Sequence, residues 1–495
     1  MPALAVRSDS CDAPLRGREL SCSQGRPILR NQTSMTNVQD TRTRQKLLLV
    51  LVAGFVIRLA LLGMPGTEDM DYFRMWGAQA LRSGILKVYT WKDEDTLTAA
   101  MMTLRGIPFH PHTSSPTDLG PALGVPDYPP GNILVLEIAV GLCKRLQGGT
   151  LRVGRLLNAC LNLPPVLFAL SSTLALWLFA RKERAPRALA ATAAFWLNPA
   201  LILTSPVLGL QDPIFAFLGL LALISAYRKR WTLSALFLAL SCLTKPQGIF
   251  LVPVLTAAAW AEGGWRSLGR YVSRGVLFFL LPLLPFILSG RLLAPTAAIF
   301  RGSIFPALSA QTANVWWLVG PVVRALAGHD WNAMRGEIGT VPQREFATLA
   351  GFSPAWISLL ALTVFTVANL YFMIRQLRAG NPYALFWAGA LQVYGYTMLA
   401  LFVHENHLYA FCVYTAPLLA LSDRKIVRLY WAVSVIFGLN LLLFDGIGRG
   451  LSGWLPGLRN LPGFDLSIPL ALANLAVFLN VIRRRCWFYD LACRS

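Results

Sequence analysis

The chain has 495 residues, of which 55% are hydrophobic and only 14% are charged, and its mean hydropathy is +0.52. A soluble protein of this length is more polar, so the composition argues against an ordinary globular enzyme and favours a membrane protein with many spans. The formal net charge is +21, but the basic residues cluster in short patches between apolar runs. That pattern is typical of cytoplasmic loops, and it argues against nucleic-acid binding.

Residues 1–45 are predicted to form a disordered cytoplasmic tail, because they are polar and Arg-rich and contain no apolar stretch of a signal peptide. Met35 could be a second start within this tail. The first predicted span, ~47–64, follows three basic residues, Arg42, Arg44 and Lys46, which indicate a cytoplasmic N-terminus. The eight cysteines are scattered without a CxxC pair, so neither a zinc knuckle nor a redox motif is indicated.

The next segments in chain order follow from the same charge rule. If Gly131–Leu146 crossed the membrane, the basic patch Arg181–Arg187 would fall outside. The stretch is also short and carries Glu137, so it is predicted to lie along the outer surface within a first outer loop, 65–155. Further spans are expected at roughly 156–180, 188–206, 212–227, 231–262 (a broken segment), 271–290, 353–374, 383–403, 407–422, 426–444 and 466–483.

The predicted fold class is therefore an all-α polytopic membrane protein with about 12 transmembrane helices and two larger outer loops that carry amphipathic helices. Residues 46–290 are expected to form the catalytic membrane module, and residues 291–352 the second outer loop. The C-terminal transmembrane helices would occupy 353–485, followed by a cytoplasmic tail, 486–495. Both termini are predicted to be cytoplasmic.

An acidic cluster opens the first outer loop, in the stretch "TEDMDYFRMWGAQALRSG" from Thr67 to Gly84. One interpretation is structural: Thr67 caps a surface helix, acids suit its first turn, and Asp71 pairs with Arg74 at i,i+3 spacing. The other interpretation is functional, because carboxylates that face outward could deprotonate a hydroxyl group.

The broken segment contains Thr244-Lys245-Pro246-Gln247 between two apolar halves. It lies between two cytoplasmic patches, so it is predicted to form a hairpin whose first half ends near Thr244, before the proline. Lys245 would then lie below the outer surface in a water-filled recess, where its charge suits a phosphate. A lysine that only extends toward the interface is the structural alternative.

Three other outer-loop motifs contribute polar or aromatic side chains. "PDYPPG" contains Asp127, and "VHENHL" contains His404, Glu405 and His407. The latter could be a metal site, but binding of a phosphate or a sugar hydroxyl is the favoured interpretation. In "SAQTANVWWLVG", Trp316-Trp317 could be an interfacial belt or a sugar-stacking platform. Together with Lys245, these groups suit a reaction with a leaving phosphate at the outer face, where the natural activated donor is a sugar on a polyprenyl phosphate.

At these residues the chain resembles the GT-C superfamily of polytopic glycosyltransferases. It is most similar to a bacterial mannosyltransferase group related to the GPI mannosyltransferases, and to the N-glycan glucosyltransferases that use dolichyl-phosphate-glucose. Asp69 stands seven residues before Trp76 with Arg74 between them, and Asp71 completes an Asp-x-Asp pattern. The blocks "DYPPG", "GLQD", "KPQG", "NVWWL" and "HEN" follow in the family's order between ~47 and ~425.

The resemblance implies an inverting transfer of one sugar, a mannose, a glucose or another hexose, from a polyprenyl-phosphate donor to a hydroxyl of a lipid, glycan or protein. Asp69 is the expected general base, with Asp71 as the second candidate. Lys245, His404 and Arg74 are expected to hold the donor phosphate. The substrate-binding candidates are Asp127, Tyr128, Gln211, Asp212, Gln247, Glu405 and Trp316. No metal or cofactor is expected.

Two alternatives remain: a carrier or flippase for a lipid-linked sugar, and a non-catalytic subunit of an envelope complex. The carrier shares the recessed cations but needs no base. The expected location is a bacterial plasma membrane, or the endoplasmic reticulum membrane if the source is a eukaryote. The sugar, the acceptor and the pathway stay open.

Overall fold

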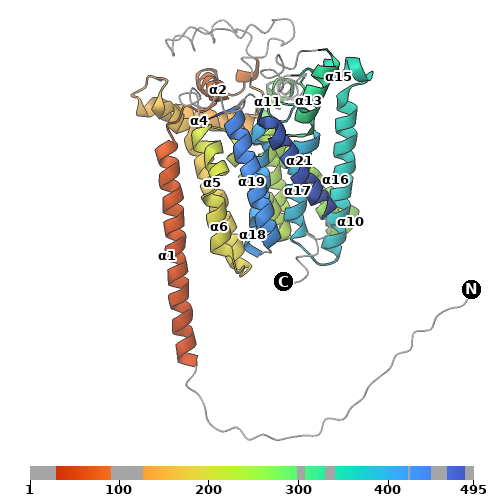
Figure 1. Cartoon of the computed structure of the whole chain (residues 1–495). Helices are drawn as coiled ribbons and strands as arrows, with labels where there is room; N and C mark the ends of the chain where they lie inside the picture. Colours follow the sequence, from red (N-terminus) through yellow and green to blue (C-terminus); the bar gives the residue numbers. More distant parts are fainter. Residues whose placement is uncertain are drawn as a thin grey trace, which may run out of the picture. The chain divides into compact units, whose positions relative to one another are not determined.

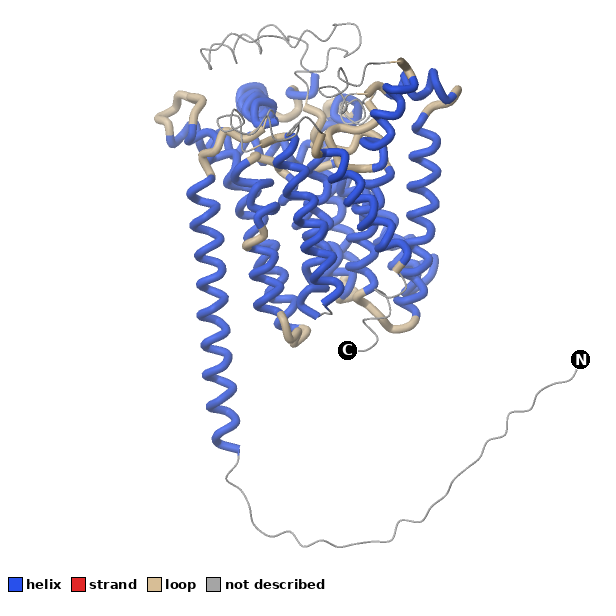
Figure 2. The backbone as a smooth tube through the Cα atoms, viewed as in Figure 1, coloured by secondary structure: helices blue, strands red, loops and turns tan. Residues whose placement is uncertain are grey.

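The computed structural model describes residues 29–67, 69–90, 126–297, 307–328, 341–421, 424–446 and 465–484. Within these ranges the chain is helical and has no strand (Figure 2). Backbone contacts divide the chain into two units, Met1–Lys46 and Leu47–Ser495, and the architecture below is that of the second unit. The prediction of an all-α protein is confirmed.

The first half of the chain supplies the helices that surround the acidic cluster. They are α1 (Leu29–Leu61), α2 (Asp69–Ser83), η1 (Val88–Thr90), α4 (Pro130–Leu146), α5 (Arg155–Lys182), α6 (Ala188–Trp196), α7 (Pro199–Ile202), η2 (Leu203–Val207), α8 (Asp212–Tyr227), α9 (Trp231–Thr244) and η3 (Pro246–Phe250).

The remaining helices complete the bundle. They are α10 (Leu251–Leu280), η4 (Leu281–Leu283), α11 (Leu284–Leu288), α13 (Val315–Leu326), α15 (Gln343–Ala350), α16 (Pro354–Arg378), α17 (Ala384–Leu399), η6 (Glu405–Leu408), α18 (Tyr409–Leu421), α19 (Arg424–Phe444) and α21 (Ser467–Arg483). The backbone of α10 leaves helical geometry at Gly263 and Gly264, the point where the sequence separates the broken segment from the next span.

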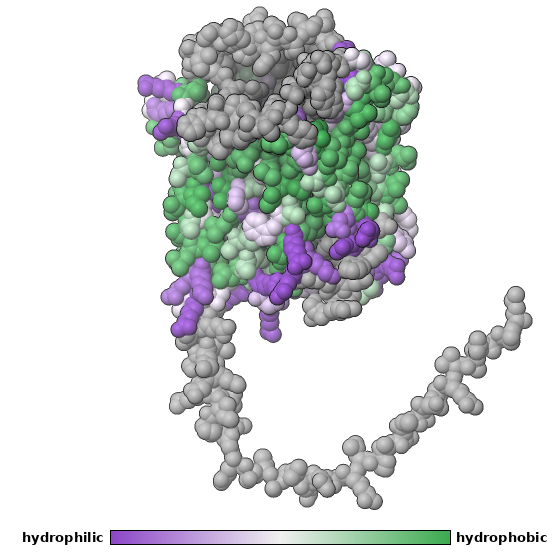
Figure 3. Space-filling model, in the orientation of Figure 1, coloured by the Kyte–Doolittle hydropathy of each residue, from purple (hydrophilic) through white to green (hydrophobic). Residues whose placement is uncertain are grey.

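Four helical segments in the described ranges are long and apolar enough to cross a membrane, or up to five if the bent pair formed by α6 with α7 and η2 counts as one span. Large apolar side chains are exposed on their outer faces, among them Leu288, Trp356 and Leu360. Figure 3 shows these surfaces as a broad hydrophobic band with hydrophilic side chains gathered below it. Because such a surface suits lipid rather than water, the protein is membrane-embedded.

Length and hydropathy alone identify fewer spans in the described residues than the twelve or so that the sequence predicts. Several helices that the sequence assigns as spans are short, such as α8 and α9. Others, such as α17 and α18, are almost fully buried by neighbouring helices. Their apolar residues therefore pack against protein as well as lipid.

Two helices of the predicted first outer loop lie across the ends of the bundle rather than alongside its members. In Figure 1, α4 runs crosswise at the end of α5, and α2 lies next to α4. Gly77 of α2 allows this close approach, since a Cβ there would lie 2.9 Å from the Leu136 carbonyl oxygen. The two helices bury Phe73 and Trp76 against Ile133 and Val140 in a common core. The surface position predicted for Gly131–Leu146 agrees with this arrangement.

The predicted hairpin break is present. Helix α9 ends at Thr244, Lys245 is extended, and Pro246 begins the short helix η3. Gly248 is required at this turn, because a Cβ there would lie 2.6 Å from the backbone nitrogen of Cys242. The turn therefore folds tightly back onto the last turn of α9.

Candidate functional site

Segments that are far apart in the sequence meet around Tyr128. Burial raises the pKa of the Tyr128 phenol well above its usual value, and four carboxylates raise it further, those of Asp69, Asp212, Asp127 and Glu405. A charge affects a pKa in this way only at short range. The start of α2, the loop before α4, the start of α8 and helix η6 therefore bring four acids to one place. We call these acids, with Tyr128, Lys245 and His404, the outer cluster.

Asp69 and Asp127 are the accessible acids of the outer cluster. Asp127 is exposed and Asp69 half-buried. Surrounding protein and the negative charge of Asp69 raise the pKa of Asp127 to about 6. Asp69 is the first residue of α2, where free backbone N–H groups favour a carboxylate. Two neighbouring acids, of which one has a raised pKa, suit proton transfer near neutral pH.

Asp71 has a different role from Asp69, because it forms an ion pair with Arg74. Arg74 also donates to the Pro65 carbonyl at 2.9 Å and to Asn158 Oδ1 at 2.7 Å. These bonds fasten α2 to the end of α1 and to α5. Arg74 is buried and engaged with protein acceptors, so its predicted contact with a donor phosphate is not supported. The Asp71–Arg74 pair therefore agrees with the structural interpretation of this part of the acidic cluster.

Thr67 was the expected cap of the same helix. Its backbone carbonyl accepts from Met70 N at 3.2 Å, but its hydroxyl finds no hydrogen-bond partner among the described residues. Glu68, the third acid of the cluster, lies outside the described residues.

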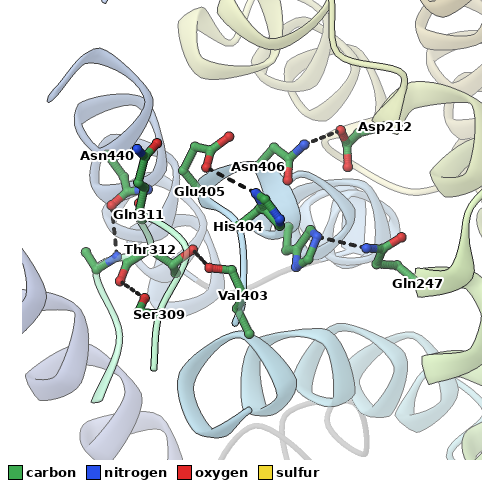
Figure 4. Close-up of polar contacts among 12 residues, drawn as sticks. Asp212, Gln247, Ser309, Gln311, Thr312, Val403, His404, Glu405, Asn406 and Asn440 are labelled. Carbon is green, nitrogen blue, oxygen red and sulfur yellow. Dashed lines mark hydrogen bonds and ion pairs between the residues drawn. The ribbon is translucent and has the colours of Figure 1, made fainter. Parts of the chain in front are cut away.

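Lys245 is buried rather than set in a water-filled recess. Its side chain is 3% exposed, and Nζ lies 2.9 Å from Oδ1 of Asp212, which is 0% exposed. The second oxygen of Asp212 accepts from Asn406 Nδ2 at 3.0 Å (Figure 4). The ammonium also lies 5.6 Å from the ring centroid of Tyr128. The recess prediction is therefore wrong, because the sequence did not indicate that Asp212 and Lys245 pair with each other.

Helix η6 and the residue before it expose one histidine and bury the other. His404 is 48% exposed, and its Nδ1 lies 3.9 Å from Oε2 of the buried Glu405. His407 shares a hydrogen bond of 2.9 Å with Gln247 Nε2. Figure 4 shows His404 between Glu405 and Gln247. His404 is thus the histidine of this motif that a ligand can reach.

The loop before η6 is fixed by contacts from the second outer loop. Thr312 Oγ1 donates to the Val403 carbonyl at 2.6 Å, and Ala310 N donates to the same oxygen at 3.2 Å. Asn440 of α19 donates to the Gln311 carbonyl at 3.2 Å (Figure 4). The position of His404 is therefore set by well-connected backbone.

Two predicted substrate-binding residues are buried away from solvent. Trp316 is 4% exposed, and its indole N–H donates to the Leu399 carbonyl at 2.8 Å. It has no open ring face for a sugar, so the structure supports a packing role. Gln211 is 1% exposed, and its Nε2 donates to the Gly209 carbonyl at 3.2 Å. Its Oε1 finds no partner among the described residues.

One charged residue within the bundle was not singled out from the sequence. Arg58 of α1 is 1% exposed, and its guanidinium lies 3.7 Å from the ring centroid of Trp196. It donates to the Trp196 carbonyl at 2.8 Å and to the Gly54 carbonyl at 3.2 Å. The sequence signal that could have identified it is a single arginine in an apolar run. A charged residue in such a run usually faces protein rather than lipid. Here it anchors α1 to α6.

No protein-family model matches the chain, and no curated protein is significantly similar to it. A function for the outer cluster is therefore inferred from its geometry alone.

Proposed function

We propose that the protein is an inverting membrane glycosyltransferase that moves one sugar from a polyprenyl-phosphate donor to an acceptor hydroxyl. The observation that carries this proposal is the pair of accessible acids, Asp69 and Asp127, close enough for one charge to raise the pKa of the other. The exposed His404 and the positive charge of Lys245 lie in the same cluster: burial and the charge of Lys245 together lower the pKa of His404, which favours the neutral imidazole. Acids, a buried positive charge and an accessible imidazole N–H at one membrane end suit deprotonation of a hydroxyl and departure of a phosphate.

In the proposed reaction the carboxylate of Asp69 accepts the proton of the acceptor hydroxyl. The hydroxyl oxygen forms a bond to the anomeric carbon while the bond from that carbon to the phosphate oxygen breaks. The electron pair leaves with the polyprenyl phosphate, and the configuration at the anomeric carbon inverts. Attack from the face opposite the phosphate needs the base and the phosphate-binding group on opposite sides of the sugar.

The remaining residues of the outer cluster have supporting roles in this proposal. His404 contacts the leaving phosphate, and Asp127 and Tyr128 border the sugar. Lys245 acts through Asp212: Lys245 and Asn406 both donate to its carboxylate and so fix its position. Gln247 positions His407 through their shared hydrogen bond. The metal-free chemistry and the hexose donor are part of the proposal, as are an outward-facing site and cytoplasmic termini.

The first test measures transfer of labelled sugar from mannosyl-, glucosyl- and arabinosyl-phosphate polyprenols in vesicles that contain the purified protein. Asp69→Asn should lower the transfer rate by about 10²–10⁴-fold, because the general base is lost. Glu137→Gln, on α4 and outside the outer cluster, is the matched control and should leave the rate unchanged. Size-exclusion profiles check that both variants fold.

The outcomes separate the candidate functions. If Asp69→Asn transfers label as fast as the parent, Asp69 is not the general base. If Asp71→Asn is equally active, the proposed acid–base mechanism fails. Movement of the labelled lipid across the bilayer without transfer would instead indicate a carrier. No transfer and no movement with any of the donors would point to a subunit without its own activity.

A further inference from the structure

A cavity opens between α19 and α21 with a volume of about 210 Å³. Its polar lining comes from Lys425 and Arg428 of α19, Asn480 of α21, and Arg484 directly after α21. Between these groups, the wall is formed by apolar side chains of both helices, including Leu429 and Val477. The cavity thus combines three cations with a hydrocarbon surface.

The helical repeat explains why these residues share one cavity. Positions 425, 428, 429 and 432 follow an i, i+3, i+4, i+7 spacing, so they lie on one face of α19. Positions 477, 480, 481 and 484 repeat the spacing on α21, which packs against α19. The lining is therefore a continuous surface shared by two packed helices.

The cavity is remote from the outer cluster. Asn440, near the other end of α19, binds the Gln311 carbonyl beside the His404 loop. Lys425 lies fifteen residues earlier in the same helix, which is roughly 22 Å along its axis at 1.5 Å per residue. Figure 1 shows α19 and α21 side by side, in agreement with their direct packing.

Positive charge is concentrated at this end of α19. The N-terminal end of a helix carries a partial positive charge, which acids normally offset. The first turn of α19 contains no acid but has Arg424 and Lys425, and Arg428 follows one turn later. The positive end of the helix and the cations together attract an anion to the cavity.

We propose that this cavity binds the phosphate of an anionic phospholipid headgroup from the leaflet opposite the outer cluster. The cations contact the phosphate, and the acyl chains follow the apolar outer surface of the two helices. That surface is exposed beside the cavity, at Trp431 and Val435 of α19 and at Leu479 of α21. A free anion would need only the cations, whereas a lipid uses both parts of the lining. The proposal rests on the membrane-embedded bundle and not on sugar transfer.

The test uses the full-length protein in phosphatidylcholine vesicles with a trace of spin-labelled phosphatidylglycerol. Electron paramagnetic resonance then gives the association constant of this lipid relative to spin-labelled phosphatidylcholine. The parent protein should prefer the anionic lipid, and Lys425→Gln, Arg428→Gln and Arg484→Gln together should remove the preference. The expected loss is about fivefold for each cation.

Two further sets of variants test whether the effect is specific to the cavity. Lys182→Gln, Arg266→Gln and Arg270→Gln remove three cations that the sequence places at the same membrane face but outside the cavity, and they should retain the preference. The single variant Arg484→Gln should give an intermediate value if the triple variant does not fold. Equal selectivity in the parent and in the cavity variants would overturn the proposal. So would displacement of the labelled lipid by millimolar inorganic phosphate, which would indicate a site for free anions.

Discussion

At the scale of single residues, the outer cluster combines groups that stabilise one another with groups that repel. Lys245 and Asn406 each donate to one carboxylate oxygen of Asp212. Burial raises the pKa of Asp127, and repulsion from Asp69 raises it further. Functional sites commonly retain such repulsion because the reaction needs the charges. Removing a stabilising group should therefore lower the melting temperature, whereas removing a repelling group should raise it.

Asp127→Asn is expected to raise the melting temperature at pH 7.5, because it removes a carboxylate that the surrounding protein desolvates and Asp69 repels. The folded pKa of Asp127 is about 6, against 3.8 without the fold. The ionised side chain therefore costs stability above pH 6, and this cost disappears as the pH falls toward 3.8. The gain should accordingly shrink between pH 7 and pH 4.5 in thermal unfolding of the detergent-solubilised protein. Asp71→Asn should instead lower the melting temperature, since Arg74 loses its ion-pair partner.

Lys245→Met is expected to destabilise the protein by about 3–5 kcal/mol, because Asp212 would stay buried without its cation. Asp212→Asn in addition removes the stranded charge, so the double variant should recover most of the lost melting temperature. A double variant no more stable than Lys245→Met would show that Lys245 acts independently of Asp212. Transfer assays on the same proteins report whether the pair also supports activity.

At the scale of elements, the outer cluster depends on how closely α4 approaches α9. Gly131, in the first turn of α4, lies so near α9 that a Cβ there would be 2.5 Å from the Leu243 carbonyl oxygen. Backbone at that distance cannot rotate away as a side chain can. The Gly131 contact therefore fixes the "DYPPG" loop beside the turn that carries Lys245.

Gly131→Ala should destabilise the fold by about 1–3 kcal/mol and reduce transfer, since α4 must move away from α9. Gly141→Ala, in the same helix, is the matched control. Its Cβ would meet only Leu81 Cδ1 at 3.5 Å, so it should be neutral or slightly stabilising. Thermal unfolding of both variants distinguishes a specific contact from a general effect of alanine in α4. A Gly131→Ala protein as stable as the parent would show that α4 moves away without cost.

Local features of the sequence predicted elements better than contacts. The Lys-Pro pair predicted the end of α9 at Thr244, and the i,i+3 spacing predicted the Asp71–Arg74 pair. The Lys245–Asp212 pair joins residues that are 33 positions apart, and the Asn406–Asp212 bond joins residues that are 194 positions apart. No local sequence pattern could therefore reveal these contacts. The burial of Trp316 likewise depends on Leu399 in another helix. Distant packing decided which side chains are accessible.

At the scale of the whole molecule, the prediction concerns which end of the bundle faces outward. In a background without reactive native cysteines, Arg152→Cys, after α4, should react with a membrane-impermeant thiol reagent added outside intact cells. Ala379→Cys, after α16, should react only once the membrane is opened. Both residues are exposed. The reverse pattern would place the outer cluster inside and remove the basis for a polyprenyl-phosphate donor.

The wide spacing of the outer cluster also sets the order in which it forms during synthesis. Asn406 follows Asp212 by 194 residues. At about 5–20 residues per second, a ribosome needs roughly 10–40 s to cover that distance. The loop with His404 is thus the last part of the cluster to leave the ribosome, after both outer acids and Lys245. A chain that stops before this loop lacks both His404 and Glu405, so the outer cluster stays incomplete until the loop has been synthesised.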